Sequence, residues 1–279
     1  EIRMYQDDPD WQTLFNLLRG LYSKNPVRID IAGTIESIAE INAKLLYSCY
    51  NTFYNLSNMA LAVAGNVSVD EVLAIADRVL PKEEKVEFEQ IIPEEDDSVV
   101  TFYTEENLGV DMTKFALGFK DVSYAPLCTP KELVCVNLAL SIIAGKVSPL
   151  YCEMLEEGLI NQSFGTEYFT GRGFSAPIFS GESKEPKKVR DKIFAQIKRL
   201  IKDGISDEDF EIAKKRYYGL EVLGFNETEN LANALVDSYF NGFGLFDTLE
   251  ECRAVTKQDV EEALKVHFDE SRSCLSVIK

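Results

Sequence analysis

Few side chains in this chain could bind a metal or transfer a proton at neutral pH, and they do not form an obvious cluster in the sequence. There are six cysteines and a single histidine, His267. No two cysteines have the C-x-x-C spacing, and one histidine cannot complete a local Cys/His zinc site. The chain opens on a carboxylate, Glu1, followed by Ile2-Arg3-Met4-Tyr5-Gln6-Asp7-Asp8-Pro9 in what reads as a helix. This opening resembles the back end of a longer motif.

The cysteines fit reduced, buried thiols better than disulfides. Most have apolar neighbours, as in Val134-Cys135-Val136 and Cys274-Leu275. Free cysteine behaves as a small apolar side chain and stays reduced in the cytoplasm. We therefore expect a cytoplasmic protein in which these residues are structural: Cys49, Cys128, Cys135, Cys152, Cys252 and Cys274.

The charge balance is strongly acidic, with 29 Lys and Arg against 47 Asp and Glu and a net charge of −18. Such a surface repels nucleic acid and anionic membranes, so neither is expected as a partner. No uninterrupted apolar run approaches the roughly 20 residues of a membrane span, and no signal segment opens the chain. Two interpretations of the acidity stay open: simple solubility, or a chamber that prefers cationic substrates.

Apolar spacing and capping residues divide the chain into helices and short strands. Proline is poorly tolerated inside a helix, so Asp8-Pro9 should interrupt the first one. The stretch 57–65 is almost wholly apolar and is predicted to be a strand buried on both faces. The other predicted strands are 99–104, 114–119, 163–170, 175–181 and 272–278, and the predicted helices are 1–22, 35–38, 42–54, 68–80, 130–144, 149–157, 186–202, 206–224, 228–240, 248–252 and 257–267.

A repeat links the two ends of the chain. Shifting the sequence by 214 residues aligns 41–63 with 255–277 without a gap, and places Asn42 on Thr256 and Ser57 on Ser271. Helix cap, helix, turn and apolar strand recur in register, as in duplicated domains. His267 falls on Phe53 in this alignment, so a structural role is expected for it.

The expected fold is α+β, with two duplicated sandwich domains in which helices cover a sheet. A chain of 279 residues is long enough for about two domains, and 81–97 is rich in Lys, Glu and Asp, as a solvated linker would be. We predict the second half of a first domain at 1–80, a linker at 81–97 and a second domain at 98–279. The second copy of the repeat needs all of 98–279, so the first domain is expected to be truncated, with Glu1 in mid-helix.

An ordered set of short stretches resembles the M16 family of zinc peptidases, which is insulinase/pitrilysin-like and includes the mitochondrial processing peptidases. The similarity is greatest to its bacterial, YmfH-like members. No single stretch is diagnostic, but together they span essentially the whole chain and correspond to the later two thirds of such a protein. The stretches are 1–9, 33–38, 53–59, 64–67, 148–151, 156–160, 213–216 and 230–233.

The resemblance implies a zinc-dependent endopeptidase that hydrolyses peptides enclosed in a chamber. Members carry His-x-x-Glu-His on one helix and a third zinc ligand, a Glu in a stretch similar to E-[EI]-x-M, on a later helix. Glu1 matches that third ligand. Two histidines and one carboxylate hold zinc with a fourth position left for water, and the Glu of the motif acts as general base.

This chain departs from the family pattern in two places. It contains no His-x-x-Glu-His, so alone it is expected neither to bind zinc tightly nor to cleave peptides, and the catalytic residues are expected upstream. It also lacks, at 154–160, the Arg and Tyr that insulysin-like members direct at the substrate. A partner, either a second M16 subunit or another copy in a homodimer, would then supply those groups to the peptide substrate.

Two alternatives remain open from the sequence. The chain could belong to a zinc-less scaffold subunit of an M16-type heterodimer, or to an unrelated α+β binding protein with a duplicated domain. Glu1 in its family context favours the zinc-bearing subunit, because a zinc-less one need not keep that carboxylate. The apolar face left by a missing half-domain also predicts a fragment that self-associates.

Overall fold

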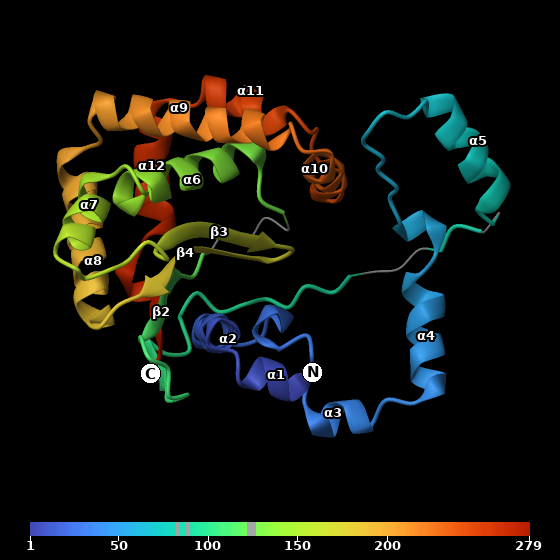
Figure 1. Cartoon of the computed structure of the whole chain (residues 1–279), viewed down its shortest axis with the longest axis horizontal. Coiled ribbons are helices and arrows are strands. Elements are labelled where there is room, and N and C mark those ends of the chain that lie inside the picture. The colour runs from blue at the N-terminus through green and yellow to red at the C-terminus, as the bar shows by residue number, and fades with distance from the viewer. Residues whose placement is uncertain (82–83, 87–89, 122–126) are drawn as a thin grey trace. The chain divides into compact units, whose positions relative to one another are not determined.

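The computed structural model describes residues 1–81, 84–86, 90–121 and 127–279 (Figure 1). Packing divides the chain into two compact units. Unit 1 comprises Glu1–Thr34, Ile92–Tyr218 and Thr248–Lys279, and unit 2 comprises Ile35–Ile91 and Gly219–Asp247. Residues 1–34 thus pack with the C-terminal part of the chain, although the sequence grouped them with 35–80. The boundaries of the two repeated domains stay a prediction.

Unit 1 is built on one five-stranded sheet with the order β1-β5-β2-β4-β3. β1 runs parallel to β5 and the other neighbours are antiparallel. The strands predicted at 163–170 and 175–181 are confirmed and form a hairpin, with Gly173 at φ 74° in its tight turn, a conformation that glycine adopts without strain. The predicted strand at 99–104 begins later, at Tyr103. The strands are β1 (Tyr103–Glu106), β2 (Lys114–Phe119), β3 (Gly165–Gly171), β4 (Phe174–Glu182) and β5 (Ser273–Ile278).

Successive side chains of a strand point to opposite faces, and this sheet buries both of its faces. Phe115, Leu117 and Phe119 of β2 pack into a large core with helices α6, α8 and α12, whereas Ala116 packs into a smaller core with α2. Figure 1 shows these helices on opposite sides of the strands. Their bounds are α2 (Pro9–Leu21), α6 (Pro130–Ala144), α8 (Pro186–Asp203) and α12 (Lys257–His267).

Local capping signals explain why the helices of unit 1 begin where they do. Thr129 and Ser148 accept hydrogen bonds from backbone N–H groups at the starts of α6 and α7, each with proline as the first helical residue. Thr256 and Asp259 form a reciprocal capping box at α12. The remaining helices of this part are α7 (Pro149–Glu156), α9 (Asp207–Gly224) and α11 (Asp247–Ala254).

By length and composition alone, the helical stretch 130–156 could cross a membrane, and most of it is buried inside the protein. It consists of two helices, α6 and α7, separated by residues 145–148. The apolar side chains of both helices pack into the core beneath the sheet. A helix that is apolar on most sides is expected in such a core.

Helix α2 closes the second face of the sheet. Leu17, Leu18, Leu21 and Tyr22 are almost fully buried against β2, β4 and β5. Full burial of such a side chain stabilises a fold by about 1.5–3 kcal/mol. At Gly20 a Cβ atom would lie 2.4 Å from the sulfur of Cys274, so the helix and β5 approach as closely as they do only because this residue has no side chain.

Unit 2 contains α3 (Ile35–Ala39), α4 (Ala43–Phe53), α5 (Val69–Val79) and α10 (Thr228–Asn241). The repeat is confirmed for its helix and turn. A shift of 214 residues carries α4 onto α12 and the short 3-10 helix Leu56–Asn58 onto Glu270–Arg272. Asn55 and Asp269 play matching parts, each accepting a hydrogen bond from the backbone N–H two residues ahead, at Ser57 and Ser271.

The predicted buried strand at 57–65 is wrong. Residues 59–64 form no strand and alternate between exposed and half-buried, with Leu61 71% exposed. The equivalent strand in the second copy, β5, lies between two partners, β1 and β2. Within the part of the chain that the structure describes, 59–64 has no strand beside it, and a lone strand leaves its backbone groups without a ladder.

Candidate functional site

Glu1 is exposed at the start of a short helix, α1 (Ile2–Gln6). Asp8 separates α1 from α2 and caps α2 by accepting hydrogen bonds from the N–H groups of Asp10 and Trp11. The two helices are held together by stacking of Tyr5 on Trp11, with ring centroids 4.6 Å apart. The predicted interruption at Asp8-Pro9 is confirmed, and Glu1 is thereby fixed to a helix that packs on the sheet.

The C-terminal end of α2 is tied to the rest of unit 1 through Glu95. This carboxylate accepts hydrogen bonds from the backbone N–H groups of Ser23, Lys24 and Asn25 at 2.7, 2.8 and 2.6 Å. It also forms an ion pair of 3.0 Å with the ammonium group of Lys120, whose side chain is 2% exposed. Burial alone would raise the pKa of Glu95, but these hydrogen bonds lower it to about 2.

The predicted linker over 81–97 stays a prediction, but Glu95 within it is not solvated. Residues 82–83 and 87–89 lie outside the described residues. The end of the segment belongs to unit 1, and the side chain of Glu95 is only 10% exposed. Within this dense run of charged residues, one carboxylate is thus buried and hydrogen-bonded, and the sequence does not distinguish it from its neighbours.

A zinc site at Glu1 is not formed by the described residues alone. Catalytic zinc takes three protein ligands and a water. Among the described His, Cys, Asp and Glu side chains, those that come together in a group of three able to hold an ion are Asp121, Glu132 and His267, and Glu1 is not among them. Glu1 could supply one ligand; the other two would have to come from outside the described residues.

The group at His267 was not anticipated from the sequence. Asp121 Oδ2 accepts hydrogen bonds from Tyr168 and Ser175, both at 2.9 Å, and lies 2.6 Å from His267 Nδ1. Burial alone would raise the pKa of Asp121, but the bonds from His267, Tyr168 and Ser175 hold it below its usual value. Because three protein groups already satisfy this oxygen, the arrangement fits a buried hydrogen-bond network, and it agrees with the structural role predicted for His267.

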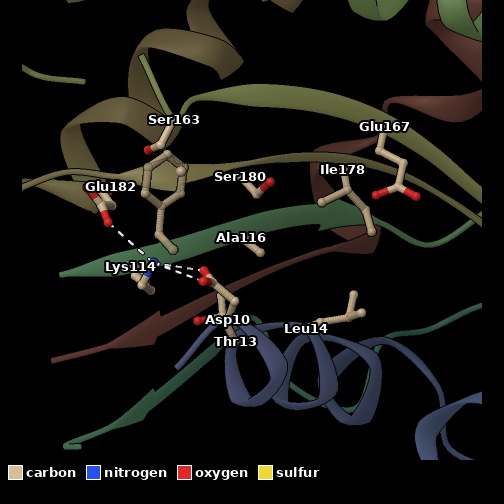
Figure 2. A pocket seen from close by; sticks show the side chains of 12 residues that line it. Asp10, Thr13, Leu14, Lys114, Ala116, Ser163, Glu167, Ile178, Ser180 and Glu182 are labelled. Atoms are coloured by element: carbon tan, nitrogen blue, oxygen red, sulfur yellow. Dashed lines mark hydrogen bonds and ion pairs between the residues drawn. The ribbon is translucent and has the colours of Figure 1, made fainter. Parts of the chain in front are cut away.

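A cavity of about 320 Å³ lies between α2 and the sheet, at the lower end of the size range of ligand pockets. Figure 2 shows Lys114 at one end, between Asp10 and Glu182, with Glu167 apart from them beside Ile178. The ammonium of Lys114 lies 2.9 Å from Asp10 and 3.2 Å from Glu182. The cavity is lined by Asp10, Thr13, Leu14, Lys114, Phe115, Ala116, Ser163, Glu167, Ile178, Ser180, Gly181 and Glu182.

Lys114 remains charged in this setting. Burial by itself would lower its pKa, but the ion pairs with Asp10 and Glu182 outweigh burial and raise the pKa. These residues come from three distant parts of the chain, so their grouping was not visible in the sequence. Asp10 lies on the same helix pair as Glu1, which connects the candidate metal ligand to the wall of the cavity.

Comparison with known proteins assigns the chain to a family. The model of the "Peptidase M16 inactive domain" matches residues 40–217. The chain belongs to the M16 peptidase family. It is 32% identical over 272 residues to the uncharacterized zinc protease YmfH of Bacillus subtilis, which covers 95% of this chain and 63% of that protein. An uncharacterized zinc protease of Rickettsia bellii is 23% identical over 217 residues, which is 77% of this chain and 51% of the relative. The chain thus spans less than two thirds of these M16 relatives.

Solved structures support the same assignment of the fold. An M16-like protein of Alicyclobacillus acidocaldarius superposes with a TM-score of 0.93 at 27% identity, covering 99% of this chain and 67% of that one. A protease of Helicobacter pylori superposes with a TM-score of 0.82 at 17% identity, covering 98% and 67%. At that identity the second likeness concerns the M16 fold alone. The predicted α+β class and family are confirmed.

Proposed function

We propose that this chain is the part of an M16 zinc endopeptidase that carries the third zinc ligand, Glu1, and forms one wall of a peptide-binding chamber. The observation that carries the proposal is the match of 95% of the chain to a relative named a zinc protease, of which the match covers only 63%. In such a protein an upstream His-x-x-Glu-His would supply two ligands and the general base.

In this proposal the residues of the chain position the zinc ligand Glu1 and enclose the peptide. Glu1 would complete the ligand set, and bound zinc would lower the pKa of its water so that it attacks a peptide carbonyl. The Tyr5–Trp11 stack fixes α1, which begins at Glu1, to α2, and α2 packs on the sheet of unit 1 and is tied down at its far end by the contacts of Glu95. The strand β3 ends the sheet, and an extended peptide added beside it would find unpaired backbone groups.

The longer protein tests the proposal directly. Purified with zinc, it should hold the metal and cleave an unstructured peptide, and Glu1→Gln should lower both zinc content and hydrolysis by at least about 10-fold, since a metal site that loses a ligand binds far more weakly. Glu40→Gln, at an exposed glutamate in unit 2, is the matched control and should change neither. Full zinc occupancy and full activity in the Glu1→Gln variant would contradict the proposal.

A second candidate is a zinc-less subunit that pairs with a zinc-bearing one. It is favoured by the matched family model, which describes the inactive domain. In that case the longer protein would bind no zinc by itself, and peptide cleavage would appear only after a second M16 subunit is added. The six free cysteines agree with a cytoplasmic location for either candidate.

A further inference from the structure

The cavity between α2 and the sheet has two ends of different character. At one end Lys114 forms ion pairs with both Asp10 and Glu182, and Glu182 also accepts a hydrogen bond of 2.7 Å from Asn161. At the other end Glu167 is exposed on β3, directly opposite Ile178 of β4. Among the described residues, the side chain of Glu167 has no hydrogen bond or ion pair, so its end of the cavity carries a negative charge with no cation beside it (Figure 2).

Apolar side chains lie between the two ends. Leu14 of α2, Ala116 of β2 and Ile178 of β4 line this part of the cavity. A ligand that fits would have an aliphatic stem to contact these side chains and a positive end group to meet Glu167. Lysine and arginine side chains have this construction, because their methylene stems pack on apolar surface while the charged head stays near water.

We propose that this cavity binds a basic side chain of an extended peptide, with its cationic end group at Glu167. Three carboxylates against one ammonium leave the cavity net negative, and the chain as a whole carries −18, which concentrates cationic ligands near its surface. Strand β3 ends the sheet, so a peptide lying along it can direct alternate side chains toward the cavity. The identity of the peptide as a substrate rests on the proposed peptidase function.

Peptide binding to this chain, measured by fluorescence anisotropy, tests the inference without any hydrolysis. The probes are three labelled nine-residue peptides that differ only at the central position, which is lysine, Nε-acetyl-lysine or glutamate. We expect the lysine peptide to bind about 2- to 5-fold more tightly than the acetylated one, the range for a partly exposed ion pair. The glutamate peptide should bind most weakly, and added salt should reduce the differences.

Three variants test where the basic side chain binds. Glu167→Gln should abolish the preference for lysine over acetyl-lysine, whereas Glu156→Gln, at an exposed carboxylate on α7, should retain it. Ser180→Leu would fill the cavity without removing a charge, and it should weaken all three peptides. Circular dichroism confirms that each variant is folded.

Equal binding of the lysine and acetyl-lysine peptides, an unchanged preference in Glu167→Gln, or no binding of any peptide would each overturn the inference. These results are separable from those for the proposed function. Loss of zinc and hydrolysis on Glu1→Gln concerns the metal site of the longer protein, and it can be observed whether or not the cavity selects a basic side chain.

Discussion

Glu95 combines three backbone N–H donors with a buried ammonium group, Lys120, and so joins the end of α2 to the sheet. Its neighbour Asp96 forms a very different pair, with Lys24, in which both side chains are more than half exposed. A buried pair is costly to break because the remaining charge stays desolvated, whereas an exposed pair contributes little. The two adjacent carboxylates therefore form a natural comparison.

We predict that Glu95→Gln lowers the free energy of unfolding by about 3 kcal/mol, since it leaves Lys120 buried opposite a neutral amide. Asp96→Asn should change it by less than about 1 kcal/mol. Urea denaturation followed by the fluorescence of Trp11, the one tryptophan of the chain, measures both in unit 1. Equal effects of the two substitutions would show that burial of the Glu95 pair has no energetic role.

The lowered pKa of Glu95 predicts a pH dependence as well. Its pKa falls from 4.5 to about 2 on folding, so between these values the unfolded chain binds more protons than the folded one. The stabilisation is complete above about pH 4.5 and is lost as the pH falls toward about 2. The difference in the free energy of unfolding between the natural protein and Glu95→Gln should therefore become smaller as the pH falls from about 4.5 toward about 2. A difference that stays constant from pH 5 to pH 3 would contradict the assignment.

The residues that matter most for these contacts could not be paired from the sequence. His267 and Asp121 are 146 positions apart, and Lys120 and Glu95 are 25 apart. The alignment of His267 with Phe53 in the repeat predicted a structural role, but its carboxylate partner depends on how helix α12 packs on the sheet. The role of Glu1 came from family resemblance, and no local signal distinguishes it from any other exposed acid.

Among the elements, α2 and β5 make the closest contact through a glycine. Gly→Ala inside a helix ordinarily stabilises a protein by about 0.5–1 kcal/mol. At Gly20 the new Cβ would lie 2.4 Å from the Cys274 sulfur, and overpacking of this kind costs about 1–3 kcal/mol. We therefore predict that Gly20→Ala destabilises unit 1, whereas Gly219→Ala, in α9 with open space around its Cα, stabilises the protein.

Thermal unfolding of the two alanine variants, followed by Trp11 fluorescence and circular dichroism, checks this prediction. Cys274→Ala combined with Gly20→Ala should recover part of the loss, because it removes the sulfur that the new Cβ meets. If Gly20→Ala is as stable as the natural protein, α2 does not need its close approach to β5.

Elements with local signals could be predicted well, and those that depend on distant partners could not. Helix α6 runs over the predicted 130–144, because Thr129 caps it and Pro130 fixes its first residue. The stretch 59–64 has the same apolar character as β5 but no neighbouring strand among the described residues. A strand is completed by its partners, so its sequence alone predicts only the tendency to form one.

At the scale of the whole chain, unit 2 leaves many apolar side chains exposed. On α4 the exposed fractions of Leu46, Tyr47 and Tyr50 are 59%, 70% and 56%. Contiguous apolar surface of this kind promotes association. We predict that the chain self-associates as its concentration rises, with an increasing mass in sedimentation velocity and binding of a hydrophobic dye.

Two substitutions that add the same charge on α4 separate the causes. Leu46→Lys removes an apolar side chain and should reduce association, whereas Asn51→Lys removes a polar one and should leave it nearly unchanged. A monomer at every concentration, without dye binding, would contradict the prediction, and so would an equal reduction in both variants, which would assign the effect to charge.

Helix α2 buries its apolar face against β5, a strand made from the last residues of the chain, 273–278. During synthesis at about 5–20 residues per second, α2 emerges early and waits many seconds for that partner. Until β5 is made, α2 can pack on β2 and β4 but lacks its third strand and the close contact of Gly20 with Cys274. A chain that stops before β5 therefore lacks the strand that covers part of the apolar face of α2.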